Sequence, residues 1–181
     1  AWAFPKLRQL SVGMACPNSK AKDLKQRYDA FLGSLGLDGA AVVRQGAALL
    51  PVSNGDPAVY RGRAALVGDA AGLVDPVTGE GIYNAIWSAQ LAAAAIAEAV
   101  AGDSPDLRAY QSAVDQHITP ELRVARVMSR LFFPALVFEM LKRDERVWRG
   151  CCLLLRREIS YTGIIQRLGG VRGLRAFLFG K

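Results

Sequence analysis

Cysteine and histidine are scarce in this sequence, which holds three cysteines and one histidine among 181 residues. Two of the cysteines, Cys151 and Cys152, are adjacent. They therefore form neither a disulfide framework nor the ligand spacing of a metal site. We expect ordinary reduced thiols, as in the cytoplasm, and no bound metal ion.

Long apolar runs are also missing. The longest candidate, LFFPALVFEM at residues 131–140, is too short to cross a bilayer and contains a proline and a glutamate. The opening residues, AWAFPKLRQL, lack the basic and apolar regions of a signal peptide and have the pattern of a strand interior. These features favour a cytoplasmic protein, and an opening inside a strand suggests a fragment of a longer chain.

Acidic residues are few at the C-terminal end. Residues 142–181 contain ten lysines and arginines against three acidic residues, and this excess accounts for the formal net charge of +7. Aliphatic blocks such as CCLLL and YTGII separate the basic residues, whereas nucleic-acid sites use stacking aromatics. The pattern favours peripheral contact with an anionic membrane surface and no nucleic acid. The alternative is a solvated helical tail with a basic face.

Hydrophobic periodicity predicts strands and a helix in the first part of the chain. Apolar residues alternate on both sides of KLRQ within residues 1–15, as in a pair of strands. A helix is expected from about 20 to 35, with Ser19 as its N-cap and Gly36 after its end. Residues 40–50 predict a further strand.

Helical patterns dominate the second part. Apolar residues at helical spacing predict a helix over 80–101 that ends at Gly102, and its many alanines allow close approach to a sheet. The apolar positions of this helix are Ile82, Ile86, Ala89, Ala93, Ile96 and Val100. A further helix is predicted to start at Ser104, with bends near Pro120 and Pro134.

The stretch RAALVGDAAGLVDPVTGEGI, residues 63–82, combines a strand, a carboxylate and a small-residue loop. The run AALVG predicts a strand buried on both faces. A strand, a glycine-rich loop and a helix N-terminus form a ligand site at the carboxyl end of an α/β sheet. Asp69 can accept hydrogen bonds from ligand hydroxyls, and bare N–H groups of the loop favour negative charge on the ligand. The ribityl chain and ring of a flavin meet both demands. The alternative is that Asp69 only caps the turn that follows the strand.

The segment GDAAGLVDPVTGEGIYNAIWSAQLAA resembles the second flavin-binding motif of FAD-dependent oxidoreductases of the p-hydroxybenzoate hydroxylase type, and most of all the geranylgeranyl reductase group. That group also carries Y-x-W-x-F-P, followed a few residues later by G-x-G. The matching positions here are Trp2, Phe4, Pro5 and Gly13. The leading tyrosine would precede Ala1, and Ala15 replaces the last glycine. The resemblance covers residues 1–101.

This resemblance implies an FAD site. Asp69 would bind the ribityl hydroxyls, with Gly68, Ala70 and Ala71 packed beneath it. The isoalloxazine ring would be bordered by Pro76, Gly79, Glu80 and Gly81, the two glycines being small because the ring lies against them. An isoprenoid chain would be lined by Trp2, Phe4 and Pro5. Reduced FAD, supplied with electrons by NADPH or a ferredoxin-like donor, would pass a hydride to a C=C bond of a geranylgeranyl group. The catalytic residues stay unknown, because packing explains Tyr83 and a structural role explains His117, which is expected away from every motif.

The resemblance also implies a fold of the α+β or α/β class, the C-terminal portion of a two-domain FAD-dependent oxidoreductase. Residues 1–50 would form part of the substrate (prenyl)-binding domain and its antiparallel sheet. Residues 51–101 would be the last strand–helix unit of the FAD-binding domain, and residues 102–181 a helical C-terminal region. The G-x-G-x-x-G segment that holds the ADP half of FAD is missing from the sequence. We therefore expect a fragment, or a subunit of a split enzyme, that is inactive as an isolated chain.

Two other functions stay open at the level of sequence. A flavin-dependent monooxygenase or halogenase would share the Gly-Asp motif, although the W-x-F-P stretch argues against it. A non-catalytic interaction module that keeps a relic of the flavin fold would lack the ADP half. If the chain is a fragment of the reductase, its strands lack their partners, and the isolated chain is expected to expose sheet edges and apolar surface and to aggregate unless a partner is present.

Overall fold

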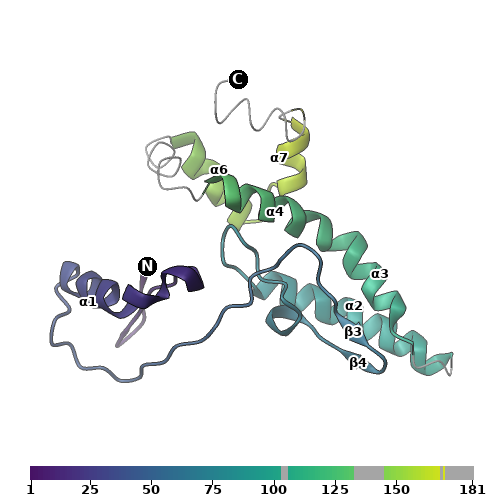
Figure 1. The fold of residues 1–181 in the computed structure, drawn as a ribbon, viewed down its shortest axis with the longest axis horizontal. Helices are drawn as coiled ribbons and strands as arrows, with labels where there is room; N and C mark the ends of the chain where they lie inside the picture. The colour runs from purple at the N-terminus through teal and green to yellow at the C-terminus, as the bar shows by residue number, and fades with distance from the viewer. Residues whose placement is uncertain (103–105, 133–144, 168, 170–181) are drawn as a thin grey trace. The chain divides into compact units, whose positions relative to one another are not determined.

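The computed structural model describes residues 1–102, 106–132, 145–167 and 169 (Figure 1). The chain divides into two compact units, residues 1–48 and residues 49–181. Short antiparallel strands and helices occur together, which is compatible with the expected α+β class. The assignment of these parts to prenyl and flavin binding stays a prediction.

A β-hairpin opens the first unit, as the alternating pattern predicted. Strand β1 (Trp2–Pro5) pairs antiparallel with β2 (Leu10–Gly13). The N–H of Lys6 donates to the carbonyl of Gln9 at 2.8 Å and closes the turn. Gly13 lies opposite Trp2 in the register, and a Cβ at this glycine would overlap the indole ring. The Trp2 indole therefore packs over Gly13, in space that any side chain at this position would fill.

The predicted first helix is present, but it starts later than expected. Ser19 lies inside a 3₁₀ turn, η1 (Asn18–Asp23), and the α-helix α1 (Leu24–Ser34) follows it without a side-chain cap. The prediction of Ser19 as N-cap is therefore wrong. The predicted end is confirmed: Gly36 has φ +66°, and the N–H of Leu37 reaches back to the carbonyl of Leu32. Only glycine adopts that conformation at little cost, which explains the stop.

Two predicted strands are not formed as expected. Residues 40–50 have no strand pairing and are exposed. The run AALVG contributes only Ala64–Ala65, strand β4, which pairs with β3 (Tyr60–Arg61). Leu66 and Val67 are exposed, so this run is not buried on both faces. The physical reason is that a strand buried on both faces needs a wider sheet around it, whereas β4 pairs with β3 alone. The only parallel pairing among the described residues is an isolated bridge between Val52 and Val74.

Helix α2 (Ile82–Ala101) matches the predicted long helix, and Gly102 is its C-cap. Its predicted apolar face, however, lies outward: Ile82, Ile86, Ile96 and Val100 are all exposed. The buried side carries the small or polar residues Asn84, Ser88, Ala92 and Ala95. The core of this unit packs against that side; its members are Val59, Ala71, Leu73, Ala92, Ala95, Tyr110, Val114, Ile118 and Leu122.

The rest of the described chain is helical, as predicted. It comprises α3 (Arg108–His117), α4 (Thr119–Phe132), α6 (Glu145–Leu155) and α7 (Tyr161–Arg167). The break between α3 and α4 falls at Ile118, beside Pro120. The predicted N-cap Ser104 and the bend at Pro134 lie outside the described residues.

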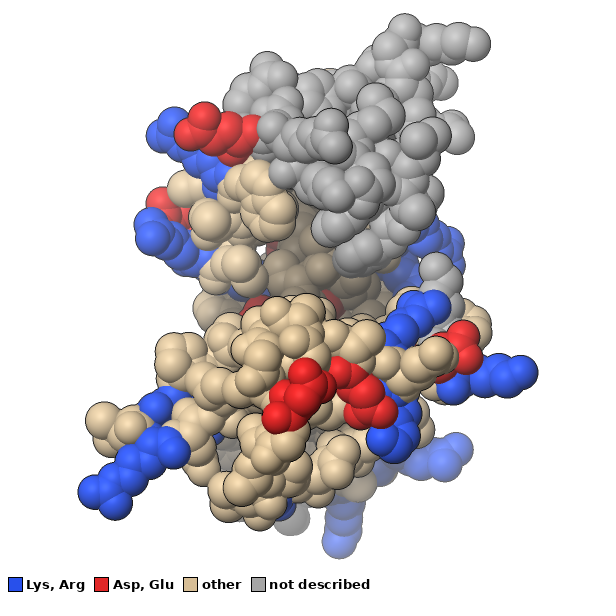
Figure 2. Space-filling model, turned by 90° about the vertical axis from the view of Figure 1, so that its left-hand side faces the viewer, with Lys and Arg blue, Asp and Glu red and all other residues tan. Residues whose placement is uncertain are grey.

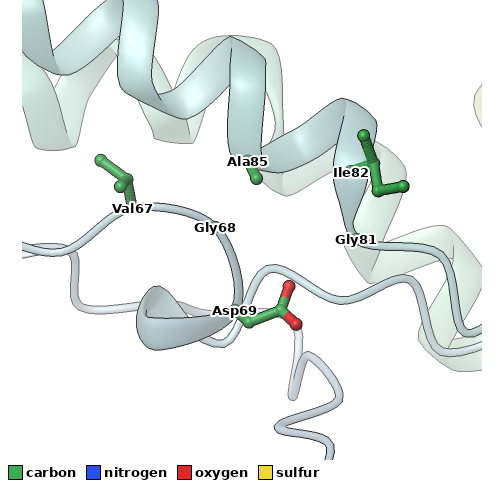
Figure 3. Close-up of a pocket in the computed structure, with 6 residues that line it drawn as sticks. All are labelled: Val67, Gly68, Asp69, Gly81, Ile82 and Ala85. Atoms are coloured by element: carbon green, nitrogen blue, oxygen red, sulfur yellow. The ribbon is translucent and has the colours of Figure 1, made fainter.

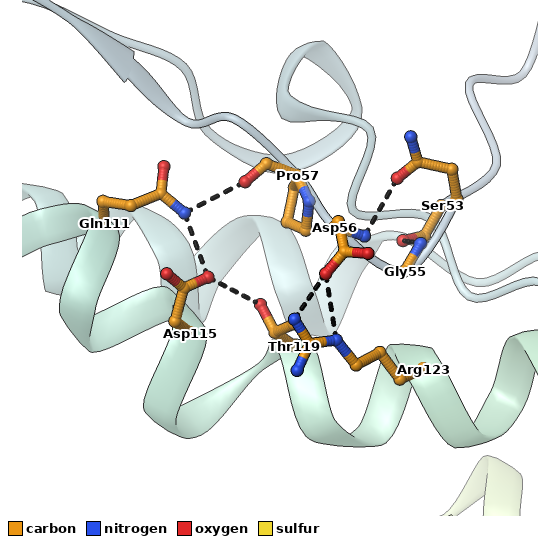
Figure 4. A network of polar contacts seen from close by, with 9 residues as sticks. Ser53, Gly55, Asp56, Pro57, Gln111, Asp115, Thr119 and Arg123 are labelled. Atoms are coloured by element: carbon orange, nitrogen blue, oxygen red, sulfur yellow. Dashed lines mark hydrogen bonds and ion pairs between the residues drawn. The ribbon is translucent and has the colours of Figure 1, made fainter.

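A polar network joins the start of the second unit to α3 and α4 (Figure 4). The Gln111 amide donates to the carbonyl of Pro57 and to the Asp115 carboxylate, both at 3.0 Å. Arg123 forms an ion pair with Asp56. These contacts fix the segment that leads into the hairpin β3–β4 against the helices.

Within the described part of the chain, every helix is too short or too polar to span a bilayer. On the face drawn in Figure 2, lysine and arginine side chains are spread around the edges and uncharged residues fill much of the surface. Contact of the basic C-terminal region with a membrane stays a prediction.

Candidate functional site

A hollow of about 380 Å³ lies where the Gly-Asp motif meets the start of α2 (Figure 3). Its lining residues are Val67, Gly68, Asp69, Gly81, Ile82 and Ala85. The structure thus brings together three of the residues expected at a flavin site: Gly68, Asp69 and Gly81.

Gly68 holds the Gly-Asp turn tightly against α2. It has φ +55°, and its N–H donates to the hydroxyl of Ser88 at 2.9 Å. A Cβ added here would stand 2.7 Å from the Cβ of Ala85. Both the backbone conformation and the lack of space require glycine, so packing on α2 is sufficient to explain it.

Asp69 is exposed at the rim of the hollow, and its carboxylate points toward the start of α2 (Figure 3). No described residue donates a hydrogen bond to that carboxylate. The Asp69 side chain therefore does not cap the turn, which was the alternative for this residue. The turn is closed by the backbone instead: the carbonyl of Asp69 accepts from the N–H of Gly72 at 2.9 Å. The acceptor positions of the carboxylate are available to ligand hydroxyls.

The two loop glycines have different reasons for being glycine. Gly79 has φ +74°, and a Cβ added there would meet no atom within 4 Å, so its backbone conformation alone requires glycine. Gly81 has an ordinary negative φ, but a Cβ there would overlap the Asp69 carboxylate. Whether a flavin ring also lies against these glycines stays a prediction, as do the roles of Ala70, Ala71, Pro76 and Glu80.

Asp75, which the sequence analysis missed, organises the loop of residues 75–81. Its side chain is only 3% exposed, and its Oδ1 accepts from the N–H groups of Val77 at 2.8 Å and Thr78 at 3.1 Å. Its own N–H donates to the carbonyl of Glu80 at 2.9 Å. An Asp-Pro pair followed by Thr-Gly is the usual signature of such a side-chain-closed turn, and this signal could have identified Asp75.

The loop delivers the chain to the uncapped N-terminus of α2. The N-cap is Gly81, and no side chain caps the helix. The first backbone N–H groups of α2 therefore carry the positive end of the helix dipole next to the hollow. Together with Asp69, the arrangement offers acceptors for hydroxyls and donors for a ring that gains negative charge.

Residues from the C-terminal helices also reach this loop. The Tyr161 hydroxyl donates to Asp75 Oδ1 at 3.0 Å, and both side chains are buried. Burial, with the adjacent Asp75 charge, raises the pKa of Tyr161 far above its ordinary value. The Arg157 guanidinium lies 4.4 Å from the centre of the Tyr83 ring, in the first turn of α2.

A row of aromatic rings continues along α2. Tyr83 meets Trp87 edge-on at 5.4 Å between centroids, and Trp87 stacks on His117 of α3 at 6.1 Å. His117 therefore takes part in the contact between α2 and α3, whereas the sequence analysis placed it away from every motif. No group of acidic, cysteine or histidine residues that could hold a metal ion occurs in the described ranges.

The residues predicted to line a prenyl cavity lie in the first unit, on β1. Trp2 is 38% exposed and Phe4 is 60% exposed, so neither is buried in a core. Trp2, Phe4 and Pro5 belong to the unit of residues 1–48, and the Gly-Asp loop belongs to the unit of residues 49–181. Their role in substrate binding stays a prediction.

Comparison with known proteins places these features in a family context. The profile of the lycopene cyclase protein family matches residues 15–148. The chloroplastic geranylgeranyl diphosphate reductase of Nicotiana tabacum is 33% identical over 139 residues, which cover 73% of this chain and 30% of that protein. The geranylgeranyl diphosphate reductase of Synechocystis is 31% identical over 141 residues, covering 74% of this chain and 34% of that protein.

An archaeal relative has a similar name and a shorter match. The digeranylgeranylglycerophospholipid reductase of Methanocella arvoryzae is 33% identical over 106 residues, covering 56% of this chain and 27% of that protein. The chain thus spans about a third of the length of the curated relatives that it matches. No solved structure matches the chain significantly. The resemblance to geranylgeranyl reductases is confirmed.

Proposed function

The chain belongs to the lycopene cyclase protein family and is similar to geranylgeranyl reductases, and from these two findings we propose that it forms part of an FAD-dependent isoprenoid reductase. The single observation that carries the proposal is the hollow where exposed Asp69 faces the uncapped start of α2. Such a site suits a ligand with hydroxyls on one part and a ring that gains negative charge on another.

The residues present fit the riboflavin half of FAD. Asp69 holds the ribityl hydroxyls, because its carboxylate is free to accept hydrogen bonds. Gly68 and Gly81 leave room in the hollow, and Pro76, Gly79 and Glu80 border the ring, to which their loop presents its backbone. Ala70 and Ala71 add no bulk beside Asp69. When bound and reduced, FAD would supply a hydride to one carbon of a C=C bond, and a proton would reach the other carbon.

We assign the substrate class from the same family membership. The relatives' names refer to geranylgeranyl groups carried by a diphosphate or a glycerophospholipid. Trp2, Phe4 and Pro5 supply apolar surface for such an isoprenoid chain. The basic excess of residues 142–181 draws the protein from the cytoplasm to the anionic membrane surface that holds prenyl lipids. The electron donor, NADPH or a ferredoxin-like protein, stays open.

The ADP half of the cofactor has to be held by another segment. The sequence contains no G-x-G-x-x-G, and the chain spans about a third of its relatives. We therefore propose that a βαβ segment outside this sequence, in the same polypeptide or in a second subunit, completes the FAD site. Reading the coding sequence upstream of Ala1 tests this directly: an in-frame strand, G-x-G-x-x-G and helix support it, and a stop codon restricts it to a second subunit.

The activity is tested on the protein that contains both halves. Reduced enzyme is incubated with a geranylgeranyl lipid, and mass spectrometry detects the gain of two hydrogens for each saturated bond. Asp69→Ala is expected to weaken FAD binding about 10- to 100-fold, because charged acceptors of hydrogen bonds contribute about 1.5–3 kcal/mol.

The matched control is Asp29→Ala, which removes an exposed carboxylate paired with Lys25 in the first unit. It is expected to leave FAD binding unchanged. If every geranylgeranyl lipid tested keeps all of its C=C bonds, the reductase assignment is overturned. Oxygen consumption stimulated by an aromatic acid would instead indicate a monooxygenase, and the absence of FAD binding would indicate an interaction module.

A further inference from the structure

Arg157, between α6 and α7, and Tyr161, the first residue of α7, contact the start of the 75–81 loop and the first turn of α2 that follows the loop. Tyr161 bonds to Asp75 at the start of the loop, at 3.0 Å. Arg157 stacks on Tyr83 just after the loop, and its Nη2 lies 3.4 Å from Oδ1 of Asn84. A short piece of the C-terminal helical region therefore bridges the loop that borders the hollow.

The hydrogen bond between Tyr161 and Asp75 is buried, and its acceptor is the same oxygen atom that accepts the hydrogen bonds within the loop. Asp75 Oδ1 accepts from Val77, Thr78 and the Tyr161 hydroxyl, so the same oxygen closes the turn and receives the distant tyrosine. Hydrogen bonds to a charged carboxylate are stronger than neutral ones, and burial makes the loss of a donor costly. The tyrosine hydroxyl therefore fixes the orientation of the carboxylate that shapes the loop.

Tyr161 is itself held by α4. The Glu121 carboxylate of α4 accepts from the N–H of Tyr161 at 2.7 Å and from the N–H of Thr162 at 3.2 Å. It also accepts from the Thr162 hydroxyl. Because these bonds anchor the first turn of α7, the tyrosine ring meets Asp75 from a rigid support rather than from a loose tail.

The contact to the first turn of α2 depends on a strained backbone. Arg157 has φ +57°, a conformation that side chains other than glycine rarely adopt. The side chain that this conformation directs lies over Tyr83 and beside Asn84, whose amide donates to the carbonyl of Leu73 at 2.7 Å. Such strain persists where the surroundings over-determine it, and often at functional sites.

We propose that Tyr161 and Arg157 are positioning residues of the candidate cofactor site: they hold the 75–81 loop and the first turn of α2 in the geometry that borders the hollow. The C-terminal helical region thereby becomes part of the site without contacting the ligand. The relevance to a flavin rests on the proposed function, whereas the positioning itself is a property of this chain and can be measured without any flavin.

The test is amide hydrogen exchange of residues 75–85 in the full chain, without cofactor and at a concentration where it is monomeric. Tyr161→Phe is expected to speed exchange at Val77 and Thr78 about tenfold, the effect of losing one buried hydrogen bond. The matched control is Tyr110→Phe, which removes another buried hydroxyl bond, to the carbonyl of Leu66 at 2.7 Å, outside the loop. Equal exchange at the loop in both variants would overturn the proposal.

A second pair of variants separates positioning from stability. Arg157→Gly relieves the strained φ and is expected to keep the melting temperature, yet to speed exchange at the N–H of Ala85, which donates to the carbonyl of Gly81 at 2.8 Å and closes the first turn of α2. Arg157→Lys keeps a cation over Tyr83 and is expected to restore slow exchange. Fast exchange in the lysine variant, or slow exchange in the glycine variant, overturns the role of Arg157. Failure of the chain to bind flavin would refute the proposed function and leave both exchange results valid.

Discussion

At the scale of single residues, the candidate site depends on glycines that are required for different reasons. Gly81 has to lack a side chain because the Asp69 carboxylate occupies the space, whereas Gly79 has to adopt a left-handed backbone in open surroundings. The two positions therefore respond differently to the same substitution.

We expect Gly81→Ala to displace the Asp69 carboxylate and to weaken FAD binding in the complete protein about tenfold or more. Its effect on the free energy of unfolding is expected to stay within about 1 kcal/mol, since an exposed side chain can move aside. Gly79→Ala is expected to lower the free energy of unfolding by about 1–2 kcal/mol, because alanine is strained at its positive φ. It leaves the Asp69 carboxylate in place, so its effect on FAD binding should be smaller than that of Gly81→Ala. Urea denaturation and flavin titration measure the two effects; equal stability losses in both variants would contradict this distinction.

Two buried tyrosines should make the fold sensitive to alkaline pH. Burial raises the pKa of Tyr110, and burial together with the Asp75 charge raises the pKa of Tyr161, from the ordinary 10.0. The unfolded chain loses these protons first, so their contribution to stability is complete below pH 10 and is lost as the pH rises above it. The slope should reach about 1.4 kcal/mol per pH unit for each tyrosine.

The measurement is the free energy of unfolding from urea titrations between about pH 8 and about pH 11. Tyr161→Phe should be less stable than the wild-type chain below about pH 10 and should show a shallower fall above it. An identical fall in the variant and the wild type would show that folding does not raise the pKa of Tyr161.

At the scale of elements, α2 shows what periodicity can and cannot predict. Its bounds and its C-cap at Gly102 followed from the sequence. Its buried face did not, because a hydrophobic pattern favours large side chains, whereas close packing on the Gly-Asp turn requires small ones. Ser88 and Ala85 are buried or half-buried there for this reason, while Ile86 is 58% exposed.

The strands and the site show the same limit. AALVG has the composition of a buried strand, but composition does not supply the neighbouring strands that would cover it. Gly68, Asp69 and Gly81 could be predicted because they are close in sequence and form one motif. The bond between Asp75 and Tyr161 joins positions 86 residues apart, and no local pattern marks such a pair.

Ser88 provides an element-scale prediction, because it ties α2 to the Gly-Asp turn. Ser88→Ala leaves the buried N–H of Gly68 without its acceptor, which stands at 2.9 Å. We expect a loss of about 1–3 kcal/mol in the free energy of unfolding. The control is Ala89→Ser, the neighbouring position on the exposed side, which should change stability by no more than about 0.5 kcal/mol. Equal losses in both variants would show that the hydroxyl has no specific role.

At the scale of the whole molecule, the chain exposes apolar surface that a folded soluble protein rarely leaves open. The exposed large aliphatic side chains of α2 and of the segment before the Gly-Asp turn are Leu66, Val67, Ile82, Ile86, Ile96 and Val100. This agrees with the expectation of exposed apolar surface, and it suits a chain whose proposed cofactor site needs a second segment. Aggregation itself stays a prediction.

We therefore expect the isolated chain to self-associate as its concentration rises, detectable by light scattering. The double variant Ile86→Lys, Ile96→Lys should stay monomeric to at least about tenfold higher concentration, because charge on the apolar face opposes burial between copies. Gln90→Lys is the control: it adds charge to the same helix at an exposed polar position and removes no apolar side chain. A wild-type chain that stays monodisperse and melts cooperatively would contradict the prediction. It would mean that this surface needs no cover, and it would favour an interaction module over half of an enzyme.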